Sequence, residues 1–84
     1  MESIFVTFRS VTFAQRGEEA LRRAGIGCSL QRTPRWMEER GCGYCLGLRQ
    51  RDGSAGVQIL RKKQVPFRKV YLRRDDGNIQ EVEL

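Results

Sequence analysis

The fold is decided first by the stretch SIFVTFRSVTFAQRGEEALRRAGI, residues 3 to 26. Its first six residues place apolar side chains at alternate positions from Ile4 to Phe8, which predicts a half-buried β-strand. Ser10 or Thr12 can cap a helix that runs to about residue 24, and apolar side chains recur along it at helical spacing. Gly25 suits the end of that helix. The stretch therefore predicts a strand followed by an amphipathic helix.

The remainder of the chain continues this alternation of strands and helices. A second, shorter helix is expected after Asp52 or Ser54, either of which can cap it, and Pro66 closes it. The dipeptide Asp76-Gly77 is typical of a two-residue hairpin turn. We expect the further strands at residues 27–32, 42–49, 67–74 and 78–84.

This order of elements predicts one α+β domain over residues 1–84. Short right-handed connections arrange it as a ferredoxin-like βαββαβ sandwich, in which one mostly antiparallel sheet carries both helices on one face. The last strand adds a C-terminal hairpin at the edge of the sheet. The other face has no helix over it, and the residues expected there are Phe5, Thr7, Gln31, Gly43, Cys45, Gly47, Tyr71 and Arg73.

The composition narrows the classes of partner. The chain carries 16 lysines and arginines against 10 acidic residues, for a net charge of +6, and 13 of the cations are arginine. Arginine makes forked contacts with phosphate, nucleic acid or anionic sulfur species, although genome composition alone also produces an arginine excess. No apolar run approaches the ~20 residues of a membrane span, and the N-terminus lacks a secretory signal pattern. We therefore expect no membrane association and a cytoplasmic protein with reduced thiols.

Two cysteines, Cys42 and Cys45, form a CxxC motif whose meaning depends on its setting. Zinc needs four ligands, but the chain has three cysteines and no histidine, so we expect no metal site and no cofactor. In a strand, residues three apart point to opposite faces, so a disulfide between these two requires a bend in the chain. A redox couple stays open as an alternative. Cys28 shares the inward face with Leu30, which predicts a small buried hydrophobe.

Nucleic-acid binding is the strongest alternative from a different class. The segment RGCGYCLGL, residues 40 to 48, overlays loosely on the RNA-recognition signature, but only Tyr44 supplies an expected aromatic residue. We also expect Glu81 and Glu83 to lie close to Arg73 and Arg74, where they partly neutralise the cations. The sequence thus predicts at most weak, salt-sensitive binding to single strands.

The residues around Cys42 favour a single activated thiol. Gly41 and Gly43 leave its sulfur sterically open and allow backbone amides to face it. Arg35, Arg40 and Arg49 are near in sequence, and any of these cations that reaches the sulfur stabilises the thiolate. Because no histidine can act as a general base, this arrangement suits a thiol that receives and passes on sulfur better than one that hydrolyses a substrate.

The order of several motifs resembles a known family. These are the opening stretch IFVTFRSVTFAQRGEEALRRAGI, then Thr33-Pro34-Arg35, then Cys42-Gly43, and finally the VYL strand around Tyr71. Together they resemble the small bacterial selenium/sulfur carrier protein-like family, over roughly residues 3 to 73. Cys45 departs from that family's usual pattern.

The resemblance implies a carrier protein rather than a stand-alone enzyme. According to this resemblance, Cys42 holds sulfane sulfur or selenium as a persulfide or its selenium equivalent, and Gly43 is its partner glycine. Thr33, Pro34 and Arg35 form the loop beside it. Cys45 is not part of this resemblance, and we expect it to act as a secondary thiol. The partners implied are unidentified sulfur or selenium donor and acceptor proteins, and a homodimer is compatible with this role.

Overall fold

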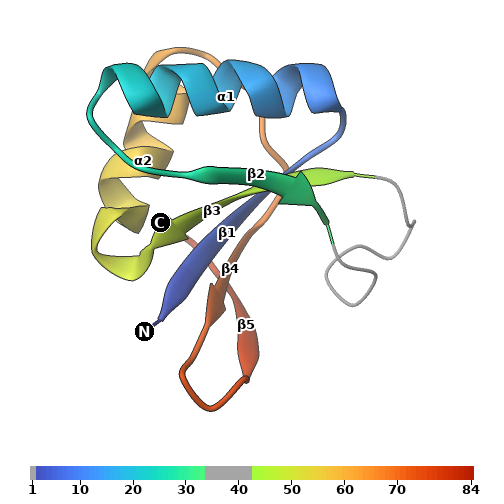
Figure 1. Cartoon of the computed structure of the whole chain (residues 1–84), viewed down its shortest axis with the longest axis vertical. Coiled ribbons are helices and arrows are strands. Elements are labelled where there is room, and N and C mark those ends of the chain that lie inside the picture. The colour runs from blue at the N-terminus through green and yellow to red at the C-terminus, as the bar shows by residue number, and fades with distance from the viewer. Residues whose placement is uncertain (1, 34–42) are drawn as a thin grey trace.

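The computed structural model describes residues 2–33 and 43–84, which form two helices and one five-stranded antiparallel sheet (Figure 1). The strands follow the order β2-β3-β1-β4-β5 across the sheet. The elements along the chain are β1 (Ser3–Phe8), α1 (Val11–Arg23), β2 (Ser29–Arg32), β3 (Tyr44–Arg49), α2 (Gln50–Lys62), β4 (Val70–Arg73) and β5 (Ile79–Val82).

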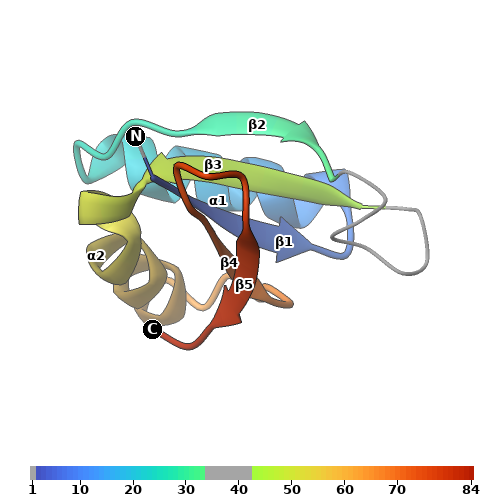
Figure 2. The same cartoon turned by 90° about the horizontal axis from the view of Figure 1, so that it is seen from below.

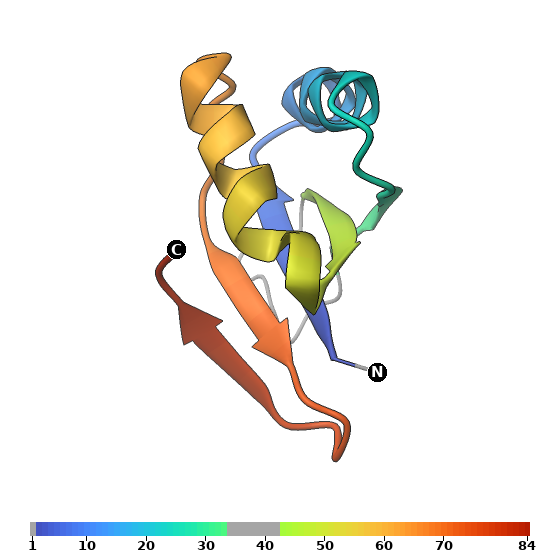
Figure 3. The ribbon, with the colours of Figure 1, turned by 90° about the vertical axis from the view of Figure 1, so that its left-hand side faces the viewer.

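Both helices lie on the same side of the sheet (Figure 3). They contact each other and the two central strands, β1 and β3. The core between the layers consists of buried apolar side chains from both helices, from β1, β3 and β4, and from the connection between α2 and β4: Ile4, Val6, Phe8, Ala14, Leu21, Leu46, Leu48, Val57, Leu60, Val65, Val70 and Leu72. The prediction of two helices over one face of an antiparallel sheet is therefore confirmed.

The strand register separates the two faces of the sheet. Residues directly opposite each other share a face, so the pairs of β1 with β3 and β4 can be followed across the sheet. Figure 2 looks onto this sheet with α1 behind it. The face away from the helices, here called the open face, carries Ser3, Phe5, Thr7, Ser29, Gln31, Cys45, Gly47, Arg49, Tyr71, Arg73, Ile79 and Glu81.

Both helices end in the same kind of cap. The Ser10 hydroxyl accepts a hydrogen bond from the backbone N–H of Phe13, so Ser10 rather than Thr12 caps α1. At its other end, Gly25 has a φ of +80°, and Ile26 N–H donates to the carbonyl of Leu21 at 2.9 Å. This is a Schellman motif, and α2 repeats it with Val65 donating to Leu60 while Gln64 adopts a φ of 57°.

The predicted start of the second helix is wrong. Helix α2 begins at Gln50, directly after β3. It is 13 residues long, as is α1, so it is not the shorter helix. Arg49 occupies its N-cap without a side-chain hydrogen bond, and neither Asp52 nor Ser54 caps it. Gly53 instead lies against β1, where an added Cβ would come within 2.7 Å of the Cγ1 atom of Ile4. The glycine allows a close helix–sheet approach and is not part of a turn.

The C-terminal hairpin is present, but its turn differs from the predicted one. The backbone N–H of Arg74 donates to the carbonyl of Asn78 at 2.8 Å, and Gly77 N–H donates to Arg74 at 2.9 Å. Three residues therefore form the loop, with Gly77 at a φ of +89° as its last member. This is a three-residue hairpin loop ending in the left-handed conformation. The strands are also one to three residues shorter at several ends than expected.

Candidate functional site

The residues predicted to form the site fall into two groups. Pro34, Arg35, Arg40, Gly41 and Cys42 lie outside the described residues, as does the predicted start of the third strand. The described group consists of Thr33, Gly43 and Cys45, and it lies at one end of β2 and β3. The structure brings the members of this second group together.

Thr33 and Gly43 are joined through their backbones. The N–H of Thr33 donates to the carbonyl of Gly43 at 3.0 Å, which continues the pairing of β2 with β3 by one step. Both residues are buried, and Thr33 is 7% exposed. The two ends of the segment that carries the predicted thiol are thus held side by side by the sheet.

Cys45 lies on the open face, as predicted, opposite Thr7 on β1 and Gln31 on β2. Its side chain is 0% exposed. Burial raises the pKa of the Cys45 thiol above its usual range, and the nearby Thr33 hydroxyl lowers that pKa by a smaller amount. This hydroxyl makes no hydrogen bond of ordinary geometry within the described chain, so we regard its contact with the sulfur as weak. Cys45 is therefore a protonated thiol without access to reagents.

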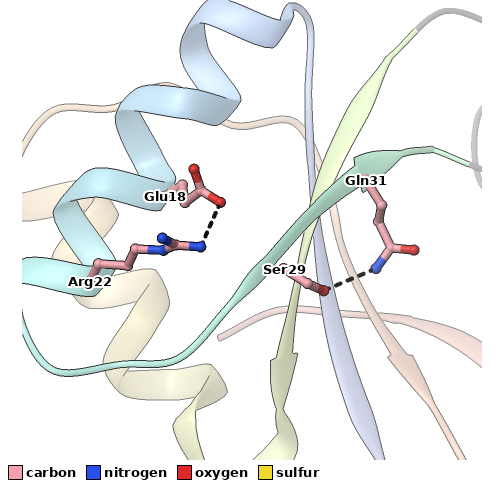
Figure 4. A network of polar contacts seen from close by, with 4 residues as sticks. All are labelled: Glu18, Arg22, Ser29 and Gln31. Carbon is pink, nitrogen blue, oxygen red and sulfur yellow. Dashed lines mark hydrogen bonds and ion pairs between the residues drawn. The ribbon is translucent and has the colours of Figure 1, made fainter.

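Cys28 precedes β2 and packs, half-buried, against the main core. Burial raises the pKa of its thiol, and the Glu18 carboxylate raises it further, while Arg22 acts in the opposite direction. Glu18 and Arg22 are themselves paired at 3.2 Å on α1 (Figure 4). The prediction of an inward-facing residue beside Leu30 agrees with this placement, and the thiol has little nucleophilic character.

Thr7 has a role beside Cys45 that the sequence did not indicate. Its hydroxyl accepts the backbone N–H of Lys69 at 3.1 Å, and its own N–H donates to the Lys69 carbonyl at 2.9 Å. Its carbonyl accepts a third bond, from Arg68 N–H, at 2.8 Å. Thr7 is 2% exposed, so these bonds fix β1 against the entry of β4 next to the Cys45 side chain. A threonine in an alternating strand carries no signal for such a contact.

The aromatic residues of the open face do not form a stacking platform. Phe5 is 9% exposed and forms a small second cluster with Cys45, against which Tyr71 and Ile79 pack. Glu81 lies on the same face as Arg73 but opposite Tyr71, and its carboxylate pairs with Lys69 at 3.6 Å. The Arg74 guanidinium donates instead to the side-chain oxygen of Gln80 at 3.1 Å.

The described residues offer neither a metal centre nor a membrane-spanning helix. In residues 2–33 and 43–84, no group of three or more histidine, cysteine, aspartate or glutamate side chains could hold a metal ion. Over the same ranges, neither helix is long and apolar enough to cross a membrane.

The chain matches a known protein family over most of its length. The family model described as "Putative Se/S carrier protein-like" matches residues 3–72, which is most of the chain. Neither the curated proteins nor the solved structures contain a match. The matched range includes both helices and the first three strands, together with Thr33, Cys42, Gly43 and Cys45. The chain therefore belongs to the Se/S carrier protein-like family.

Proposed function

We propose that this protein is a carrier that holds sulfane sulfur or selenium on Cys42 and relays it between partner proteins. The observation that supports this most is the family match, since it spans residues 3–72 and includes Cys42. We assign the ferredoxin-like class to the β2-β3-β1-β4 order, with β5 as an added edge strand. We also assign the protein to the bacterial cytoplasm, where thiols stay reduced.

The two described cysteines, Cys28 and Cys45, are poorly suited to accept sulfur, and this supports Cys42 as the acceptor. The thiolate is the nucleophile in sulfur transfer, and burial raises the thiol pKa of both Cys28 and Cys45. Cys45 is in addition closed to any partner by its burial. Cys42 stands between Gly41 and Gly43 in a chain rich in arginine, which is the setting that favours a thiolate.

The transfer we propose has two halves. In the first, the Cys42 thiolate attacks the outer sulfur of a persulfide on the donor. A new S–S bond forms on Cys42, the donor's S–S bond breaks, and the donor cysteine leaves as a thiolate that takes a proton from water. In the second half, an acceptor thiolate attacks the outer sulfur on Cys42, and Cys42 leaves as a thiolate. No net oxidation occurs, because the sulfane sulfur moves from one thiolate to another.

The chain positions this chemistry through Thr33 and Gly43. Their hydrogen bond of 3.0 Å holds the two ends of the segment together where β2 pairs with β3. We propose that Arg35 and Arg40 stabilise the thiolate and then the terminal sulfur anion, with Pro34 shaping the loop. A carrier must stabilise this terminal sulfur without reacting with it. Guanidinium groups stabilise the anion and do not give up a proton at neutral pH.

The two alternative functions lose support on specific observations. A redox couple needs Cys45 as a reactive resolving thiol, but Cys45 is buried and its pKa is raised. A nucleic-acid platform needs exposed rings, but Phe5 is buried in the second cluster and Tyr71 packs against that cluster. We therefore keep the carrier function alone.

The relay itself can be tested with cyanide. The chain is loaded by a cysteine desulfurase with cysteine, freed of both, and treated with cyanide, which removes sulfane sulfur as thiocyanate. We expect one thiocyanate per chain for the wild type and for Cys28→Ala, and none for Cys42→Ala. Equal release from the wild type and Cys42→Ala would overturn the assignment of Cys42.

A further inference from the structure

The open face contains a hollow of about 610 Å³ at the end of the sheet where β3 passes into α2. Its lining includes Phe5, Ser29, Gln31, Gly47, Arg49 and Arg51. By register, Ser29 and Phe5 lie on either side of Gly47. Gln31 lies two residues along β2 toward Cys45, and Arg49 lies two residues along β3 in the opposite direction, toward α2. Three strands and the first turn of α2 therefore contribute to one surface.

Gly47 is the reason that the surface is hollow. An added Cβ on Gly47 would lie 3.1 Å from Nε2 of Gln31, 3.2 Å from Oγ of Ser29 and 3.3 Å from Cε1 of Phe5. Any larger residue at this position would fill the space directly over the sheet. The φ of Gly47 is not positive, so its backbone conformation does not require a glycine. The glycine matters here because the absence of a side chain leaves the space open.

The polar side chains around Gly47 have hydrogen-bond donors that their mutual contact does not use. Nε2 of Gln31 donates to Oγ of Ser29 at 3.3 Å (Figure 4). That bond leaves one N–H on Gln31 and the O–H of Ser29 to donate elsewhere. Both side chains are exposed at the rim and do not enter the core.

The charge at the end of the hollow is positive, so it favours an anion as the neighbouring hydrogen-bond donors do. Arg49 and Arg51 line it, and neither forms an ion pair with any acid in the described ranges. Asp52 is the one acidic residue among the lining residues, so the lining carries two cations against one anion. Guanidinium groups beside amide and hydroxyl donors match the oxygens of an oxyanion.

We propose that this hollow binds an oxyanion between Arg49, Arg51, Ser29 and Gln31. The ligand is a sulfate-like or phosphate-like group, either free or as the end of a small organic molecule whose remainder lies over Gly47 beside Phe5. The volume of the hollow has room for either form. This inference does not depend on the sulfur chemistry of Cys42, since it is argued from residues of β1, β2, β3 and α2 alone.

The test is a titration of the ¹⁵N-labelled full chain, followed by its amide shifts at constant ionic strength maintained with sodium chloride. The probes are sulfate, thiosulfate and adenosine monophosphate. We expect saturable shifts at residues 29–31 and 47–51, with a Kd on the order of 1 mM for an exposed site of this kind. Tighter binding of the monophosphate assigns the ligand as organic, whereas equal affinity assigns a free oxyanion.

Variants connect the shifts with the named residues. Arg49→Gln removes a charged donor and should weaken binding about tenfold. Gly47→Val should abolish it, and its amide spectrum shows whether the variant still folds. Arg73→Gln is the matched control, because Arg73 lies on the other side of Ser3 on the same face and does not line the hollow. Unchanged binding in Arg49→Gln, or shifts no larger with sulfate than with added chloride, would overturn the proposal.

Discussion

The reactivity of Cys45 gives the sharpest check on the geometry of the site. Its side chain is 0% exposed, and its pKa is raised by burial, so an alkylating reagent can reach it only after the structure opens. If β3 opens only with global unfolding, and if stability is about 5 kcal/mol, the open fraction is on the order of 1 in 1,000 or less. Cys45 should therefore react at least about a thousandfold more slowly than an unfolded thiol.

The assay is a time course with iodoacetamide at pH 7.5, followed by peptide mapping, in buffer and in 6 M guanidinium. In denaturant all three cysteines should react alike, which supplies the reference rate for each. In buffer we expect the order Cys42, then Cys28, then Cys45, because Cys28 is only half-buried. Labelling of Cys45 in buffer as fast as Cys28 would refute the reasoning from burial.

Three further predictions concern stability, each measured by urea unfolding. Thr7→Val should cost about 1 kcal/mol, because the N–H of Lys69 loses its acceptor at 3.1 Å; an unchanged midpoint would contradict the role given to this hydroxyl. Gln64→Gly should stabilise by about 0.5–1 kcal/mol and Gly25→Ala should destabilise similarly, because both positions have positive φ; shifts in the same direction would count against the caps. Between pH 8 and 10 the wild type should lose stability, because its unfolded thiols release protons at a lower pH than the folded ones, and Cys45→Ala should lose less. Equal slopes would show that Cys45 is not the titrating group.

Much of the fold was predictable because it rests on local periodicity. The alternation from Ile4 to Phe8 and the helical spacing after Ser10 are confirmed as β1 and α1. The open face was also predicted from alternation alone, including the presence of both Cys45 and Thr7 on it. These features depend on residues only a few positions apart in the chain, so the sequence pattern alone predicts them.

The start of α2 could not be predicted from the same local rules. The letters RDGS have the composition of a turn, but Gly53 and Gly56 lie where the helix meets Ile4 and Leu48 of the sheet. A glycine that permits close packing and a glycine that forms a turn look alike in the sequence. Tertiary contact decides between them, and it overrides the expected cap at Asp52.

The register of β5 differs from the one that its turn dipeptide predicts. A two-residue turn at Asp76-Gly77 would put Glu81 opposite Leu72, whereas the three-residue loop puts it opposite Tyr71. One residue of slip moves every side chain of β5 to the other face. The burial of Cys45 likewise depends on its neighbours on adjacent strands, and the same alternation would fit an exposed thiol.

The central claim is that Cys42 carries the sulfur, and intact mass measures this directly. The chain is incubated with a cysteine desulfurase and cysteine, and its mass is read before and after treatment with a reductant. The account predicts that the wild type and Cys45→Ala each gain the mass of one sulfur atom, which the reductant removes, while Cys42→Ala gains none. A reducible gain of one sulfur in Cys42→Ala, equal to that of the wild type, would contradict it.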